Sequence, residues 1–266
     1  MKLRKNRTAA VAAALMIICS GCSANTTELQ TVDSAPLVLS ESSFPEGEAT
    51  RLSADEQKIW NNGEKGGVKV NARLYKFSGF DGADVLNEKL RNEVESQIQE
   101  LQSMRGEQIG EISGGGHSMC AYGADCSFRQ NGDVLSVKLD CSYSLPYGAH
   151  DVLYARFFNV NMRTGEFYDS VYDIFQDPEQ GRSALKSLLE QSLREHCADE
   201  ETLRLGEANF QKIDEDYPFY LENDELFAYF EAYALFPGSS YSSLPVSLAA
   251  LNKAAPLVDG VLGDYA

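Results

Sequence analysis

The chain has 266 residues, of which 43% are apolar and 24% are charged, so it is long enough for one large hydrophobic core or two small ones. Its formal net charge of −17 argues against binding to nucleic acid or to anionic lipid surfaces. The acidic balance favours either simple solubility or a cationic partner.

The first 22 residues have the pattern of an exported bacterial lipoprotein. Four basic residues lie within residues 2–7 and precede an apolar run over residues 9–18, which is the layout of a secretory signal and is too short to span a bilayer. The following Cys19-Ser-Gly-Cys22 resembles a lipobox, with cysteine where leucine is usual at the first position. An ordinary signal peptide that is cleaved elsewhere is the alternative.

We therefore expect residues 1–21 to be a lipoprotein signal peptide and Cys22 to be the first mature residue. Two or three acyl chains such as palmitate on Cys22 would anchor the protein stably to the extracytoplasmic face of the cell membrane. Residues 22–52 are rich in Ser, Thr, Glu and Pro and are expected to form a disordered tether. Such a tether would reach on the order of 30 Å. Without residues 1–21 the chain has 40 acidic and 19 basic residues, a net charge of −21.

Residues 53–130 are interpreted as a small N-terminal α+β domain. Ser53-Ala-Asp-Glu56 fits a capping box and predicts a short helix over residues 54–60. Apolar residues alternate with polar ones over residues 68–77, which predicts a half-buried strand. Asp81 can cap a helix whose apolar residues recur at helical spacing, namely Leu86, Leu90, Val94, Ile98 and Leu101. A further strand is expected over residues 117–128.

Residues 131–258 are interpreted as a second α+β domain, followed by a tail over residues 259–266. Asn131-Gly132 predicts a hairpin, and Asp177-Pro178 predicts the start of a helix. Strands are expected over 134–143, 152–162, 219–221 and 226–233, a second helix over 199–212, a loop over 235–244 and a closing segment over 245–251. This order predicts the α+β class, with a mixed, mostly antiparallel sheet packed on a few amphipathic helices.

Four cysteines follow Cys22, namely Cys120, Cys126, Cys141 and Cys197. An even number in an exported chain allows one or two disulfides, whereas export from an anaerobe would leave free thiols. The pairing cannot be read from the sequence. The spacing of His117, Cys120 and Cys126 is wider than that of usual zinc sites, so we expect no metal and no cofactor.

Several motifs in order resemble a known family. They are Tyr147-Gly-Ala-His150, Phe157-Phe-Asn-Val-Asn-Met-Arg-Thr-Gly165, Tyr172-Asp-Ile-Phe175, Phe219-Tyr-Leu-Glu-Asn-Asp-Glu-Leu-Phe-Ala-Tyr-Phe230 and Leu244-Pro-Val. Their order resembles the RsiV-type C-terminal domain, a domain of unknown function shared with the anti-sigma factor RsiV. The strand and helix over 68–101 are similar to the small domain that precedes it in PdaC-type polysaccharide deacetylases. The resemblance implies an extracytoplasmic α+β module, which binds lysozyme in the founding member.

The turn over residues 144–151 and the loop over residues 236–243 are the candidate contact surfaces, with Tyr147, Gly148, His150, Pro237 and Tyr241 as candidate ligand-binding residues. The expected partner is a cationic protein such as lysozyme, or a cell-wall glycan. No G-x-S-x-G, H-E-x-x-H or P-loop motif is present, so we expect a binding or sensing module and not an enzyme. A structural envelope protein without a discrete ligand is the alternative, and a hydrolase that pairs His150 with a carboxylate is less favoured.

Overall fold

The computed structural model describes residues 53–111, 120–145, 151–213, 216–237 and 242–262. Their elements are, in chain order, β1 (Ser53–Lys65), β2 (Val68–Ser78), α1 (Ala83–Glu111), β3 (Cys120–Asn131), β4 (Val134–Ser144), β5 (Val152–Asn161), the 3-10 helix η1 (Val171–Ile174), α2 (Pro178–His196), α3 (Glu200–Phe210), β6 (Phe219–Glu222), β7 (Glu225–Phe230), β8 (Ser242–Ser247) and α4 (Leu248–Ala254). The fold belongs to the predicted α+β class. Within the described residues, no helix is both long and apolar enough to cross a membrane.

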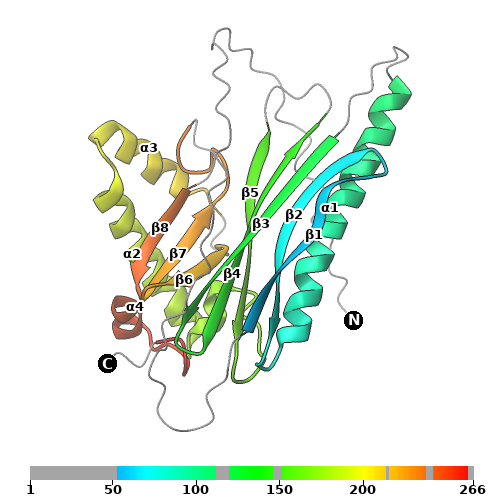
Figure 1. Ribbon diagram of the computed structural model, residues 1–266. Helices are drawn as coiled ribbons and strands as arrows, with labels where there is room; N and C mark the ends of the chain where they lie inside the picture. The colour runs from blue at the N-terminus through cyan, green and yellow to red at the C-terminus, as the bar shows by residue number, and fades with distance from the viewer. Residues whose placement is uncertain (1–52, 112–119, 146–150, 214–215, 238–241, 263–266) are drawn as a thin grey trace, which may run out of the picture. The chain divides into compact units, whose positions relative to one another are not determined.

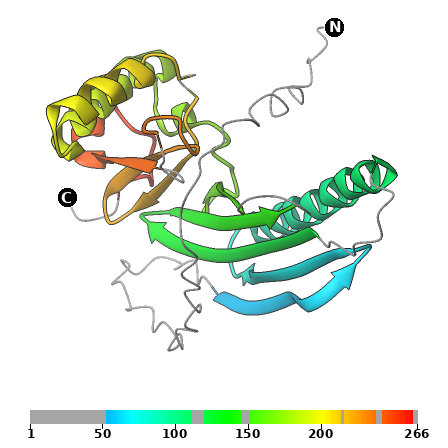
Figure 2. The same cartoon turned by 90° about the horizontal axis from the view of Figure 1, so that it is seen from above.

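A five-stranded sheet contains the strands in the order β1-β2-β3-β4-β5. Only β2 and β3 run parallel, and the other neighbours are antiparallel. A parallel pair needs a crossover connection, and α1 supplies it by lying along one face of the sheet (Figures 1 and 2). The sheet is therefore mixed and mostly antiparallel, as predicted.

Helix α1 buries the apolar stripe that the sequence predicted. Leu86, Leu90, Val94 and Ile98 are all buried and belong to the hydrophobic cluster that this helix shares with the five-stranded sheet. Residues three or four positions apart lie on one face of a helix, so the stripe faces the sheet along several turns. The helix begins at Ala83, two residues after the predicted capping residue Asp81.

The helix predicted over residues 54–60 is wrong, because these residues belong to strand β1. A seven-residue helix is marginal on its own, whereas the ladder that pairs Ser53 with Ser78 and Lys65 with Val68 supplies backbone hydrogen bonds along the strand. Gly66 and Gly67, with φ of 60° and 80°, form the tight turn that folds β1 back onto β2. Strand pairing therefore overrides the local capping pattern.

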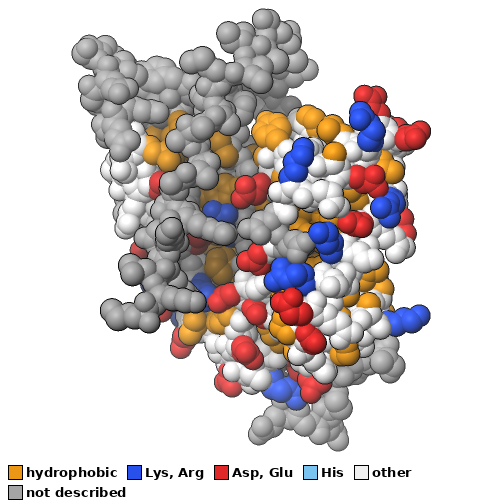
Figure 3. Space-filling view, turned by 180° about the vertical axis from the view of Figure 1, so that it is seen from behind, with side chains coloured by type: hydrophobic (Ala, Val, Ile, Leu, Met, Phe, Trp, Pro, Cys, Tyr) orange, Lys and Arg blue, Asp and Glu red, His pale blue; other side chains and the backbone are white. Residues whose placement is uncertain are grey.

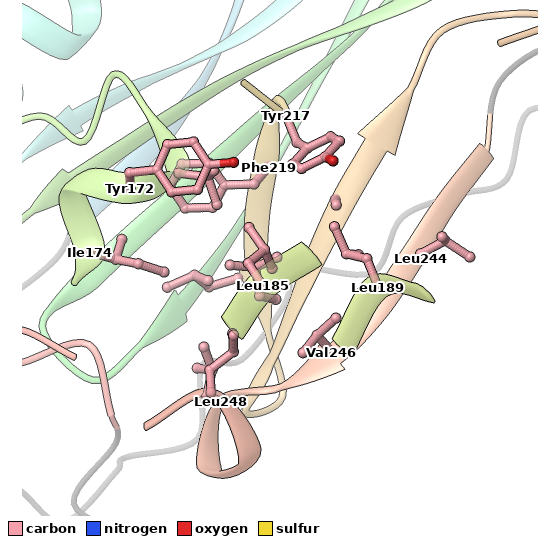
Figure 4. Close-up of a cluster of buried hydrophobic side chains, with 14 of the residues drawn as sticks. Tyr172, Ile174, Leu185, Leu189, Tyr217, Phe219, Leu244, Val246 and Leu248 are labelled. Carbon is pink, nitrogen blue, oxygen red and sulfur yellow. The ribbon is translucent and has the colours of Figure 1, made fainter. Parts of the chain in front are cut away.

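A second, three-stranded antiparallel sheet has the order β6-β7-β8 and packs on α2. Asp177 caps α2 by accepting hydrogen bonds from the backbone N–H groups of Glu179 and Gln180, and Pro178 is the first helical residue, as predicted. Leu185 and Leu189 of α2 are fully buried against the sheet. Figure 4 shows these leucines among the side chains of both elements.

Two buried polar side chains, Ser136 of β4 and Asn159 of β5, join the sheets. The Ser136 hydroxyl donates to Asn159 Oδ1 at 2.6 Å and accepts from the Leu221 N–H at 2.9 Å. Asn159 Nδ2 donates to the Phe219 carbonyl at 2.9 Å. These bonds occupy backbone groups of edge strand β6, so the first sheet satisfies the polar edge of the second.

The segment near residue 260 is fixed to the β3–β4 hairpin. The Asp133 N–H donates to the Gly260 carbonyl at 2.8 Å, and Asn131 Nδ2 donates to the Val261 carbonyl at 2.8 Å. Gly132 has φ +57° at the tip of the predicted hairpin. The five-stranded sheet continues through this hairpin, across residue 131, where the sequence predicted a domain boundary.

Candidate functional site

The face of the five-stranded sheet that is turned away from α1 carries a row of polar side chains. On β2, Val68 and Val70 are buried under α1, whereas Lys69 and Asn71 are exposed. The register places Asn71 beside Gly123 of β3 and Gly123 beside Ser142 of β4. Because side chains alternate between the two faces of a strand, these positions share one face.

Besides two tyrosines, seven residues line a shallow hollow of about 250 Å³ here, which we call the Lys69–Asp151 hollow: Lys69, Asn71, Ala121, Gly123, Ser142, Ser144 and Asp151. Gly123 lies at its floor, where an added Cβ would come within 2.8 Å of Ser142 Oγ. Glycine inside a strand weakens it and often marks a place where another group comes close. The missing side chain therefore keeps the floor open.

The two tyrosines at the hollow contribute backbone and not rings. Tyr122 and Tyr143 also line it, but both side chains pack in the cluster beneath α1. Tyr122 is only 2% exposed there, and its hydroxyl lies 3.5 Å from Cys141 Sγ. The side chains that line the hollow are thus mostly charged, amide and hydroxyl groups, with the methyl group of Ala121 among them.

A larger hollow of about 420 Å³ lies between α2 and α3. Four of its polar groups bind one another in pairs: Arg194 pairs with Glu207 at 2.9 Å, and Gln211 donates to Glu190 at 3.0 Å. Arg204 lines this hollow as well. We take the Lys69–Asp151 hollow as the candidate site because Ser144 and Asp151, the two ends of the predicted contact turn, both line it.

Of the candidate ligand-binding residues, only Pro237 lies within the described residues, where it is exposed. Tyr147, Gly148, His150 and Tyr241 lie outside them, as do Cys22 and His117. Ser144 and Asp151, the two ends of the predicted contact turn, are described and both line the hollow. The sequence analysis missed the hollow itself, although exposed polar residues at every second position of β2, with a glycine in β3, were the available signal.

The described residues hold no group of three His, Cys, Asp or Glu side chains that could bind a metal ion. His196, the one histidine among them, ends α2 with its Nδ1 2.8 Å from the Ser192 carbonyl. This local contact ties the ring to its own helix.

The cysteines from residue 120 onward are free thiols in the structure. Cys120, Cys126 and Cys141 are buried, and Cys197 is half-buried. The register pairs Cys126 with Leu139, so Cys126 and Cys141 are diagonal neighbours. Diagonal neighbours have Cα atoms roughly 7–8 Å apart, whereas disulfides usually span at most about 6.8 Å. The strand pairing thus favours two separate thiols at Cys126 and Cys141.

We expect Cys197 alone to react with Ellman's reagent in the folded mature chain at pH 8, because burial protects the other three thiols. Unfolding in guanidinium without a reductant should raise the count to four. Fewer than four thiols in the unfolded chain would show that a disulfide had formed and would contradict this expectation.

Burial also makes two of these thiols weak acids. Desolvation raises the pKa of Cys126 to about 12 and the pKa of Cys141 to about 11, from an ordinary value of 9.0. The pKa values of Tyr122 and Tyr154, beneath the same helix, are raised by burial as well. Neither thiol is a nucleophile near neutral pH.

We expect the free energy of unfolding to fall as pH rises from about 9 to 11. The unfolded chain loses its thiol protons near pH 9 while the folded chain keeps them, so each buried thiol lowers stability by about 1.4 kcal/mol per pH unit. Urea unfolding at pH 8, 9 and 10 measures this slope. Cys126→Ala should make the slope shallower, and an unchanged slope in that variant would exclude Cys126 as a cause.

No protein-family model matches the sequence, and no curated protein matches it. Two solved structures are similar. One is a DUF3298 family member from Bacteroides fragilis NCTC 9343, with 15% identity and a TM-score of 0.49 over 79% of this chain and 94% of that chain. The other is a DUF3298 family protein from Pseudomonas aeruginosa PAO1, with 16% identity and a TM-score of 0.48 over 81% and 98%. DUF3298 is the domain family of unknown function that the sequence resemblance invoked.

Proposed function

We propose that this protein is a lipid-anchored binding module on the extracytoplasmic face of a bacterial cell membrane. The observation that carries the binding role is the Lys69–Asp151 hollow, which is lined by polar side chains of β2 and β4 and by Gly123 of β3 between these strands. The anchor rests on the basic, apolar and Cys19-Ser-Gly-Cys22 segments in sequence. The RsiV-type resemblance supports sensing or binding, and the module acts without catalysis.

The partner that the charge favours is a cationic protein such as lysozyme, with a cell-wall glycan as the other candidate. The acidic excess is uneven: residues 165–262 contain nineteen acidic and six basic residues, whereas residues 53–164 contain fifteen and twelve. Acidic and basic side chains are interspersed over the uncovered part of the face in Figure 3. The net acidic excess over residues 165–262 attracts a cationic partner over long range, and salt weakens this attraction.

Binding of lysozyme to the purified mature domain at 25 mM and 300 mM NaCl tests the cationic-protein form of this proposal. We expect binding at low salt that weakens at least tenfold at high salt. No binding at either salt concentration would remove lysozyme as the partner. Retention on insoluble cell-wall material in the same buffers tests the glycan form.

A further inference from the structure

The turn that follows strand β7 carries an exposed tyrosine, Tyr233. It is 60% exposed, the largest exposed fraction among the large hydrophobic residues of the described ranges. Within those ranges its ring neither stacks on another ring nor lies beneath a cation. Burial of an aromatic side chain is favourable, so a tyrosine in this position leaves that gain unused in the isolated protein.

The backbone of Tyr233 is strained as well. Its φ is +64°, and the only other non-glycine residues with positive φ in the described part of the chain are Asn223 and Asp224. Asn and Asp tolerate this conformation because their short polar side chains form local hydrogen bonds, whereas a bulky residue does not. A glycine would adopt the same φ without strain. Tyrosine is therefore unfavourable here for two separate reasons, its exposure and its backbone.

Contacts on both sides of Tyr233 hold the turn in place. The Ala234 N–H donates to the Glu231 carbonyl at 3.0 Å, which closes the turn. Asn209 Nδ2 of helix α3 donates to the Leu235 carbonyl at 3.0 Å, and the Leu235 side chain is fully buried. A strained residue persists only where its surroundings fix it, and such residues concentrate at functional sites. A side chain on a fixed turn also loses little freedom when it binds.

From these observations we infer that Tyr233 is the principal contact residue for a cationic protein and that its ring receives a lysine or arginine side chain of that partner. The face of a tyrosine ring attracts a cation, and tyrosine is frequent among the residues that dominate the energy of protein interfaces. This inference rests on the cationic-protein form of the proposed function. It adds a contact surface outside the Lys69–Asp151 hollow.

The charge around Tyr233 supports a cationic side chain as the occupant. Residues 213–252 contain seven acidic residues and no lysine or arginine. Glu231 is exposed two positions before Tyr233, and its carboxylate makes no ion pair with the residues that the structure describes. By contrast, Glu222 is paired with Arg129 at 2.6 Å. An acidic surface raises the local concentration of cations, whereas a neutral sugar gains nothing from it.

Lysozyme binding by variants of the purified mature domain at 25 mM NaCl tests the contact. We expect Tyr233→Ala to weaken binding at least tenfold and Glu231→Gln to weaken it by a smaller factor. Tyr233→Phe should bind as the parent chain does, because the contact needs the ring and not the hydroxyl. Val85→Ala, at a 49% exposed position of α1, is the matched control and should have no effect. Undiminished binding by Tyr233→Ala would overturn the inference.

The stability of two variants separates this contact from a role in folding. Tyr233→Gly removes the unfavourable φ and Tyr233→Ala keeps it, so the glycine variant should unfold at the higher urea concentration. Both variants lack the ring and should bind lysozyme equally weakly. If the glycine variant unfolds at the lower urea concentration, the backbone of Tyr233 is not strained and the inference is overturned.

A small cationic probe tests the ring apart from lysozyme. Titration of the isotope-labelled mature domain with pentalysine should give saturable amide shifts at residues 231–234, which pentalysine with acetylated side chains does not give. Equal shifts with both peptides, or shifts with N-acetylglucosamine alone, would overturn the assignment to a cation. Pentalysine shifts without lysozyme binding would support the inference and remove lysozyme as the partner. Lysozyme binding that Tyr233→Ala does not weaken would overturn the inference and leave the proposed function intact.

Discussion

Asn159→Ala should lower the free energy of unfolding by about 2–5 kcal/mol, because it breaks a buried hydrogen-bond network and leaves its partners unsatisfied. Asn159 is 3% exposed and connects the Ser136 hydroxyl to the Phe219 carbonyl. After the substitution, the Phe219 carbonyl loses its donor in a place that water does not reach. Urea unfolding followed by circular dichroism measures the change.

Asn87→Ala is the matched control. Asn87 also makes two hydrogen bonds, with the Phe77 N–H and carbonyl at 2.8 Å each, but this pair is only partly buried. Water can replace the lost partner there, so the cost should be about 1–2 kcal/mol. Ser136 and Asn159 share a hydrogen bond, so Ser136→Ala should lower the free energy of unfolding less in the Asn159→Ala variant than in the parent chain. Equal effects of Asn159→Ala and Asn87→Ala would contradict the network's role in joining the sheets.

Gly132→Ala should destabilise the protein by about 2–4 kcal/mol, from two separate causes. Its φ of +57° is unfavourable for alanine by about 1–2 kcal/mol. An added Cβ would also collide with the carbonyl oxygens of Gly260 and Leu262. Relief of that collision requires the 258–262 segment to move, and the hydrogen bond from Asp133 to Gly260 would be lost. Thermal and urea unfolding of the variant measure the total.

Gly66→Ala has only the first of these two causes, the positive φ. Gly66 has a similar φ of +60°, but its Cβ would meet the flexible end of the Gln102 side chain and not backbone. We expect a cost of only about 1–2 kcal/mol there. In a chain that lacks residues 258–266, Gly132→Ala should then lower the free energy of unfolding by no more than Gly66→Ala does. If the two glycine variants are equally stable, the segment does not constrain the hairpin.

Local sequence patterns predicted most of the elements because their signals act over a few residues. The apolar stripe of α1, the Asp177-Pro178 start of α2 and the Asn131-Gly132 hairpin each depend on neighbours within about one helical turn or one hairpin. Strand β1 was predicted as a helix because its capping pattern is local, whereas its pairing with β2 depends on the turn at residues 66 and 67. The pairing of β1 with β2 therefore decides the conformation of these residues, and the local capping pattern does not.

The candidate site depended on strand order, which no local pattern supplies. Lys69 and Gly123 are 54 positions apart and share the hollow because α1 lets β2 and β3 pair in parallel. Asn159 is likewise a polar residue in a largely apolar strand, and its role depends on β6, whose Phe219 carbonyl accepts its hydrogen bond. The predicted turn was close to the site along the chain, because its ends at Ser144 and Asp151 line the hollow.

The central claim, an anchored module outside the cytoplasm, is tested most directly by the mature N-terminus of the protein expressed in a bacterial host. Membranes are washed with high salt, the protein is extracted with detergent, and the N-terminal peptide is analysed by mass spectrometry. We predict a chain that begins at Cys22 and carries two or three acyl chains, and a Cys22→Ser variant that is not lipidated. An unmodified chain that begins at another residue, or one that retains Met1 in the cytoplasmic fraction, would contradict the account.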